Sequence, residues 1–288
     1  MLSKRRGVLA FLLITFAFTW SGMFFVRYAL DVSLANPLAQ LPWALGPALV
    51  AVVVRKWVTR EGFGDAALAL RLRPAWREYL VAWLGPLGLV VATCLLTAAL
   101  GLWSPDLGAL DDFVPGLPWW VTVLLLLVLV VVLTPIYWGE EFGWTGYLRM
   151  RLLPGRPLLA TLVTGLIWAV WHYPLAFLGY AEFDNVALGL LVWTVFFLQQ
   201  EILLTWLRLR SGTIWTTSLA HAGNNLIFAL LTATLLTRGE GGDLDPLLVM
   251  LLTMVPMVPL CAWVLVTGRY RAEQPPAPAA AELAWAGR

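Results

Sequence analysis

The sequence predicts an all-α membrane protein, a bundle of about eight transmembrane helices with both termini in the cytoplasm. Hydrophobic residues make up 60% of the chain and charged residues 12%, and the mean hydropathy is +0.80. Soluble domains are about 25% charged. Long apolar stretches recur along the chain, and the connections between them alternate in charge. We therefore expect the lipid bilayer, and no nucleic acid, among the partners.

The apolar stretches approach the roughly 20 residues that a helix needs to span a bilayer. The shortest is the second one. The expected spans are residues 8–26, 41–54, 79–103, 118–138, 158–178, 186–207, 213–236 and 246–267.

The connections divide into two sets that alternate along the chain. One set is basic and contains Lys4, Arg5, Arg6, Arg55, Lys56, Arg60, Arg71, Arg73, Arg77, Arg149, Arg151, Arg156, Arg208, Arg210, Arg269 and Arg271. The other is acidic and contains Asp31, Asp106, Asp111, Asp112, Glu182, Asp184, Glu240, Asp243 and Asp245, with Arg27 and Arg238 as its basic residues. Lys and Arg favour the cytoplasmic side of a membrane. This alternation predicts an even number of spans and cytoplasmic termini.

The domain organisation is expected to be simple. We predict one transmembrane helical domain at residues 1–271, with a motif-bearing core at about 121–229, and a disordered cytoplasmic tail at 272–288 that is rich in Pro and Ala. The first apolar stretch is long for a signal peptide, so an uncleaved helix is favoured. The expected location is a cell membrane, namely the bacterial cytoplasmic membrane, with a multi-pass topology.

Both histidines of the chain, His172 and His221, lie inside apolar stretches. An ionisable group within a membrane is costly, and it is a functional candidate by default. Each has a partner four residues away on the same helix face, Trp168 for His172 and Asn225 for His221. These two helix faces are therefore candidate walls of one site.

Two adjacent carboxylates, Glu140 and Glu141, follow the fourth apolar stretch. Alone they could mark the end of a span, and Asn224 and Asn225 alone could be polar contacts between helices. The rest of the membrane interior is nearly free of strongly polar side chains. Taken together, these residues indicate a site.

Amide hydrolysis explains this choice of residue types. It needs a base for water, a group that orients the water and donors for the developing oxyanion. Glu140 can take the proton and His172 can orient the same water. His221 and Asn225 can face the oxyanion.

A catalytic zinc is the alternative, because Glu140, His172 and His221 are residue types that ligate zinc and would leave one coordination position for water. The helical signature His-Glu-x-x-His is absent from the sequence. Only two histidines are available, and Asn225 is a poor zinc ligand. We expect metal-free hydrolysis, with zinc as the alternative cofactor.

Three segments together resemble the motifs of the CAAX-protease and bacteriocin-processing (Abi) family of intramembrane proteases. Residues 140–148 read EEFGWTGYL, residues 166–175 read LIWAVWHYPL, and residues 218–226 read SLAHAGNNL. The order and spacing of the motifs are preserved over about residues 121–229. This family includes the endopeptidase that trims prenylated CAAX proteins and the lysostaphin-resistance proteins.

The resemblance implies a role for each motif residue. Glu140 would be the base that activates water, and His172 would be its partner. His221 and Asn225 would form the third motif, near the substrate carbonyl, and Glu141 would be a supporting carboxylate.

Two positions depart from the family pattern. Thr145 stands where the first motif usually has Arg, and Trp168 replaces a frequent Phe of the second motif. Loss of the arginine removes a partner for Glu141 or for the substrate, and Arg149, one turn further on, could compensate. Asn224 and these two residues complete the expected supporting set.

The resemblance implies an intramembrane endopeptidase that cleaves a membrane-bound or lipid-modified peptide near the cytoplasmic side. One alternative is an inactive family member that acts as a membrane binding or immunity protein, because Thr145 replaces the arginine. A proton-coupled transporter is a weaker alternative, since transporters usually contain paired repeats and these polar residues lie in one half of the chain.

Straight helices with the predicted ends would hold Glu140 near the inner surface and His172 about four turns deep. We therefore expect the fourth helix to be bent at Pro135 or to continue past Trp138, beside a hydrated cavity. Glu201 could line the same cavity, but we expect it instead to extend toward Arg208 at the membrane surface.

Overall fold

The computed structural model describes residues 2–111, 114, 116–237 and 244–267. Within these residues every regular element is a helix. Eight helical stretches are long and apolar enough to cross a membrane, which confirms the predicted fold class and number of spans. The predictions for Asp112, Arg238, Glu240, Asp243, Arg269, Arg271 and the tail lie outside the described residues. The eight stretches are Arg5–Tyr28, Pro37–Thr59, Trp76–Ala99, Trp119–Arg151, Pro157–Ala176, Val186–Ser211, Ile214–Thr237 and Pro246–Val266.

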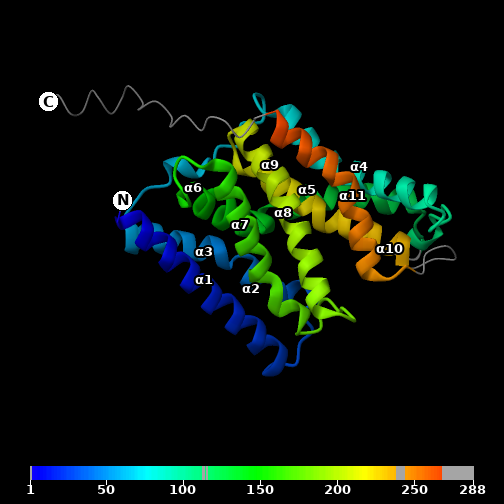
Figure 1. The fold of residues 1–288 in the computed structure, drawn as a ribbon, viewed down its shortest axis with the longest axis horizontal. Helices are drawn as coiled ribbons and strands as arrows, with labels where there is room; N and C mark the ends of the chain where they lie inside the picture. The colour runs from blue at the N-terminus through cyan, green and yellow to red at the C-terminus, as the bar shows by residue number, and fades with distance from the viewer. Residues whose placement is uncertain (1, 112–113, 115, 238–243, 268–288) are drawn as a thin grey trace.

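Several of these spans consist of more than one helical element (Figure 1), and three contain a π-helical turn. The α-helices are α1 (Leu2–Tyr28), α2 (Pro37–Ala44), α3 (Gly46–Val53), α4 (Trp76–Ala99), α5 (Trp119–Gly143), α6 (Arg149–Arg151), α7 (Pro157–His172), α8 (Val186–Ser211), α9 (Ile214–Gly223), α10 (Leu230–Thr237) and α11 (Pro246–Val266). The π-helical turns are η1 (Val54–Thr59), η4 (Trp144–Leu148) and η6 (Asn224–Ala229), and the 3₁₀ turns are η2 (Gly64–Ala66), η3 (Gly108–Leu110) and η5 (Tyr173–Ala176).

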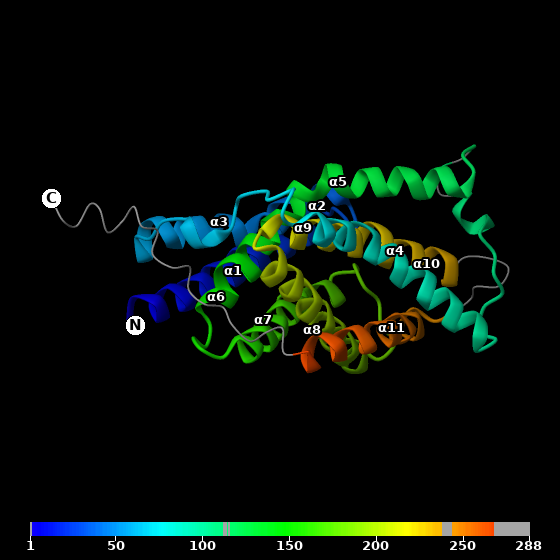
Figure 2. The ribbon, with the colours of Figure 1, turned by 90° about the horizontal axis from the view of Figure 1, so that it is seen from above.

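The bundle has two chemically different ends. We call the end with the connections after η1, α6 and α8 the basic face, and the end with the connections after α1, α4 and α7 the acidic face. In Figure 2 the N-terminus lies at the left, toward the basic face, and the connection from α4 to α5 lies at the right. The described charges follow the predicted alternation between the two faces.

The fourth span is longer than its apolar stretch predicts. The predicted end at residue 138 is wrong, because α5 continues through η4 and α6 to give a span of 33 residues. The expected extension past Trp138 is therefore confirmed, and it carries the two carboxylates into the bundle.

Two glycines allow the extended part of α5 to pack tightly against the second span. A Cβ atom at Gly139 would lie 2.5 Å from the carbonyl oxygen of Ala44, and one at Gly143 would lie 2.3 Å from the Cβ of Pro47. Glycines four residues apart let helix backbones approach closely in membranes. The second span is interrupted between α2 and α3, where these contacts fall. Any larger residue at either glycine would push the helices apart.

The seventh span, made of α9, η6 and α10, lies at the centre of the bundle (Figure 1). It is the most buried of the eight spans, because 67% of its most apolar stretch lies inside the protein. Helix α9 packs against α4, α5 and α8, and α7 packs against α8. The three segments that carry the sequence motifs are thereby brought to one region.

Candidate active site

Glu140 lies on α5 in a nearly buried position, with 7% of its surface exposed. The indole Nε1 of Trp168 donates a hydrogen bond of 2.9 Å to its Oε2. A buried carboxylate needs such donors, because an unpartnered polar group inside a protein is costly. The bond fixes one oxygen of Glu140 and leaves the other for a ligand or a water.

His172 is the last residue of α7, and its Nδ1 lies 2.9 Å from the backbone oxygen of Trp168. A carbonyl oxygen can only accept, so Nδ1 carries the hydrogen and Nε2 remains able to accept one from water. The imidazole stacks on the ring of Phe197, with the ring centroids 4.3 Å apart. Its orientation is therefore held from two sides.

His221 and Glu141 form a buried pair. The Nδ1 of His221 lies 2.9 Å from Oε1 of Glu141, and the two residues are 3% and 1% exposed. Thr145 donates to the other oxygen, Oε2, of Glu141 at 3.0 Å. His221 is not among the residues that line the cavity described below, so its position near the substrate carbonyl stays a prediction.

Trp168 contacts both histidines of the site. Its ring centroid is 5.7 Å from that of His172 and 5.2 Å from that of His221. With its Nε1 bonded to Glu140, this one side chain contacts three of the predicted catalytic residues. Trp168 therefore organises the site, although its sequence signal was only its spacing from His172.

Asn225 and Asn224 point to different places. Both belong to the π-helical turn η6, directly after the helix that carries His221. Asn225 is exposed and lines the cavity. Asn224 donates to Oε1 of Gln200 and does not line that cavity. Of the two, only Asn225 can reach a substrate there.

A cavity of about 1560 Å³, including its open part, joins the predicted residues. Glu140, His172 and Asn225 all line it, together with the side chains of Tyr137, Tyr180 and Gln40. Three of the four predicted catalytic residues therefore share one cavity. The fourth, His221, lies against it, because its ring is 5.1 Å from that of Tyr137.

Three residues that sequence reasoning missed belong to this region. Tyr137 lies three residues before Glu140 on the same helix face, a spacing that could have revealed it. Phe197 and Tyr180 come from α8 and from the connection before it. Neither has a local pattern that distinguishes it from other aromatic residues of the chain.

Glu201 differs from expectation, and Glu141 has an uncharged donor where the family arginine would lie. Glu201 is 1% exposed and accepts a hydrogen bond of 2.9 Å from Thr205, so the prediction that it extends to the surface is wrong. Thr145, in the position of the family arginine, still supplies Glu141 with a donor, although without a charge. Arg149 is buried as well, with 2% of its surface exposed.

The positions of the possible ligand side chains bear on whether the site could bind zinc. Among the described residues no three His, Cys, Asp or Glu side chains form a group that could hold a metal ion. Nδ1 of His221 is bonded to Glu141, and Nδ1 of His172 to a backbone oxygen. These two bonds orient the imidazole rings, and a metal would have to bind through Nε2.

The fold and this site define a polytopic helical membrane protein with a carboxylate, an imidazole and an amide in one intramembrane cavity. Residues 117–227 match the family model "Rce1-like: Type II CAAX prenyl endopeptidase Rce1-like". The match includes all three motifs and confirms the resemblance of this part of the chain to CAAX-type intramembrane proteases. No curated protein matches the chain.

Proposed function

We propose that the protein is an intramembrane endopeptidase that hydrolyses a peptide bond of a membrane-associated or lipid-modified substrate. The observation that carries this proposal is the shared cavity of Glu140, His172 and Asn225, with Glu140 oriented by Trp168. The match to the family model supports the reaction class.

In the proposed reaction, Glu140 accepts a proton from a water that also donates a hydrogen bond to Nε2 of His172. The water oxygen attacks the carbonyl carbon of the substrate. The side-chain amide of Asn225 donates to the resulting oxyanion, which is the step that such donors stabilise most. Glu140 then returns the proton to the leaving amine, so that a carboxylic acid and an amine are released.

His221 and Glu141 act in this scheme as a positioning pair. The pair is buried and contacts the rings of Trp168 and Tyr137 through His221. It thereby holds the walls on which Glu140 and Asn225 depend, without contact with the substrate.

No metal is required in the proposed mechanism, and zinc is the alternative. Among the described residues no group of three His, Cys, Asp or Glu side chains is placed to hold a metal ion, which supports a water activated by Glu140 and oriented by His172. Activity that disappears on exhaustive chelation and returns with stoichiometric zinc would decide for zinc.

The test is cleavage of a quenched membrane peptide by the purified protein in detergent. Wild-type protein should cleave it before and after chelation, and Glu140→Gln should not. The matched control is Glu78→Gln, which removes a carboxylate bonded to Arg210 at 3.1 Å on the basic face. A folded wild-type protein that cleaves no member of a diverse peptide set would support an inactive family member that only binds its partner.

A further inference from the structure

The walls of the cavity come from one side of the bundle. Leu34 lies in the connection from α1 to α2, and Tyr180 lies in the connection from α7 to α8. Both connections belong to the acidic face. From there the cavity continues past Leu133 to Glu140 and Asn225. None of its described lining residues belongs to a connection of the basic face.

A packed layer separates Glu140 from the basic face. Phe142 is 1% exposed, and Tyr147 and Ile214 are fully buried. Gly146 approaches Ile214 so closely that a Cβ at the glycine would lie 2.8 Å from the Cδ1 of Ile214. Protein interiors are packed about as densely as organic crystals, so this buried layer leaves no passage for a peptide.

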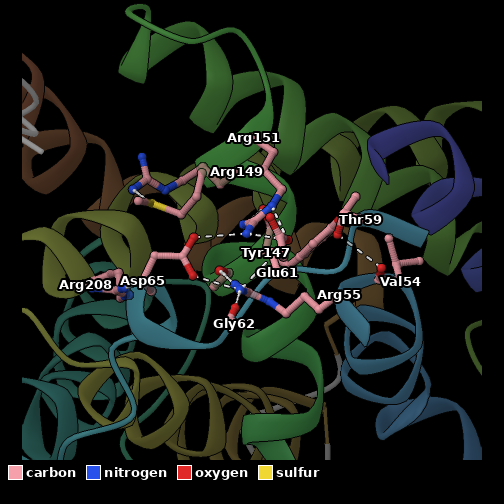
Figure 3. Close-up of polar contacts among 12 residues, drawn as sticks. Val54, Arg55, Thr59, Glu61, Gly62, Asp65, Tyr147, Arg149, Arg151 and Arg208 are labelled. Atoms are coloured by element: carbon pink, nitrogen blue, oxygen red, sulfur yellow. Dashed lines mark hydrogen bonds and ion pairs between the residues drawn. The ribbon is translucent and has the colours of Figure 1, made fainter. Parts of the chain in front are cut away.

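A charged cluster closes this layer from outside (Figure 3). Arg55, at the end of the second span, is fully buried and donates to Oδ1 of Asp65 at 2.8 Å and to the carbonyl oxygen of Gly62 at 2.6 Å. Arg151, at the end of the fourth span, donates to Oδ2 of Asp65 at 3.0 Å and to Oε1 of Glu61 at 2.7 Å. The two arginines thus share one carboxylate and join the two spans.

The same loop is tied to the sixth and seventh spans. Thr213 donates to the carbonyl oxygen of Ala69 at 2.6 Å, and Trp215 donates through Nε1 to that of Leu68 at 2.8 Å. Arg208 donates to the backbone oxygen of Asp65 at 3.4 Å. Residues 61–69 therefore cross the basic face and connect four spans there. We call this segment the basic strap, after the face that it crosses.

We propose that the cavity is open to water and substrate from the acidic face alone, and that the packed layer and the basic strap close it from the basic face. Because Lys and Arg favour the cytoplasmic side, the substrate peptide then enters from the extracytoplasmic side or the outer half of the bilayer. This proposal relies on the proposed function only where it calls the ligand a substrate. It replaces the expectation of cleavage near the cytoplasmic side.

Single cysteines test this access directly. Cys94 and Cys261 are buried and unpaired, so a background with both changed to alanine is the starting point. Leu226→Cys places a thiol on the cavity wall beside Asn225. Glu182→Cys and Arg73→Cys are exposed reference positions on the acidic and basic faces. Phe142→Cys, in the packed layer, is the matched control.

Right-side-out and inverted membrane vesicles are treated with an impermeant thiol reagent. The proposal expects Leu226→Cys to react from the side on which Glu182→Cys reacts, and Phe142→Cys to react from neither side. Reaction of Leu226→Cys from the side of Arg73→Cys, from both sides, or from neither would overturn it. Intact cells should label Glu182→Cys and leave Arg73→Cys unlabelled, and the reverse would overturn the extracytoplasmic assignment.

The outcome does not depend on catalysis, because labelling measures access alone. The peptide assay in detergent, in contrast, is open to both faces and tests hydrolysis alone. Cleavage in detergent combined with labelling of Leu226→Cys from the basic face would refute one-sided access and leave the protease intact. Labelling from the acidic face without cleavage would do the opposite.

Discussion

The two ends of this bundle bury polar groups in different ways. Toward the acidic face, Glu140, His172 and Asn225 line an open cavity, and each has few protein partners. Toward the basic face, the fully buried Arg55 is paired with a carboxylate and with main-chain oxygens. The functional groups keep capacity for a ligand, whereas the buried guanidinium of Arg55 is held by partners within the protein.

This difference predicts that substitutions on the cavity side change activity and leave stability nearly constant. Substitutions in the basic strap and its partners should do the reverse.

The largest effect is expected for Glu140→Gln. The amide keeps the shape of the side chain but cannot accept the proton, so kcat should fall by about 10³-fold or more. The melting temperature in detergent should change by no more than that of Glu78→Gln. Retention of more than a tenth of the wild-type kcat would refute Glu140 as the base.

A loss of about 10²-fold in kcat is expected for Asn225→Ala, with a smaller change in KM. Removal of one oxyanion donor costs about this much in other hydrolases. Asn224→Ala is the control, because its side chain is bonded to Gln200 outside the cavity. Equal losses of kcat in both variants would indicate a general effect of η6 rather than an oxyanion donor.

In the charged cluster of the basic face, Arg55→Met should lower the free energy of unfolding by about 2 kcal/mol. The variant loses three hydrogen bonds from a charged donor, to Gly62, Asp65 and Gly146. Asp65 keeps Arg151 as a partner. Thermal unfolding in detergent would measure the change. Arg27→Met removes an exposed pair with Asp31 and should have little effect. A loss of kcat in Arg55→Met without a change in melting temperature would break the division between the two ends.

Trp168→Phe should reduce kcat by about 10-fold. The ring remains, but Glu140 loses a donor worth about 1.5 kcal/mol or more to a charged group. Trp171→Phe is the matched control, since its Nε1 donates to Thr19 at 2.7 Å instead. If both variants lose activity equally, ring packing rather than the bond to Glu140 is responsible.

The smallest effect concerns Asp65, whose carboxyl is 46% exposed. Partial burial raises its pKa, but the guanidinium groups of Arg151 and Arg55 outweigh burial and hold the pKa below 3.8. A lowered pKa stabilises the fold above the unfolded value of about 4, and this contribution is lost as the pH falls through the folded value.

Wild-type protein should therefore melt a few degrees above Asp65→Asn at neutral pH. The difference should stay constant down to about pH 4 and shrink below it. Unfolding followed as a function of pH measures it, with Glu78→Gln as the control. A difference that grows on acidification would contradict the assigned ion pairs.

The fold could be predicted from the sequence because span length and loop charge are properties of the chain itself. Pro37–Thr59 and Trp119–Arg151 were both predicted too short, for the same reason. Arg55 and Glu140 interrupt the apolar pattern, yet both residues are buried by partners from other spans. Apolarity alone cannot reveal a charge that is satisfied in the tertiary structure.

The residues of the site could be predicted from the sequence, but not which of them line the cavity. Glu140, His172 and Asn225 line one cavity as expected, while His221 lies behind them. The π-helical turn η6 follows His221, so Asn225 is not simply one α-helical turn above it. A spacing of four residues therefore did not fix which of the two faces the cavity.

The proposed cleavage can be followed in membranes by comparing peptide termini between wild-type protein and Glu140→Ala. We predict new C-termini that require Glu140 and that lie in the outer half of the membrane or on its extracytoplasmic side. Identical sets of termini in the two membranes would contradict the proposed protease, and Glu140-dependent termini confined to cytoplasmic segments would contradict the proposed direction of access.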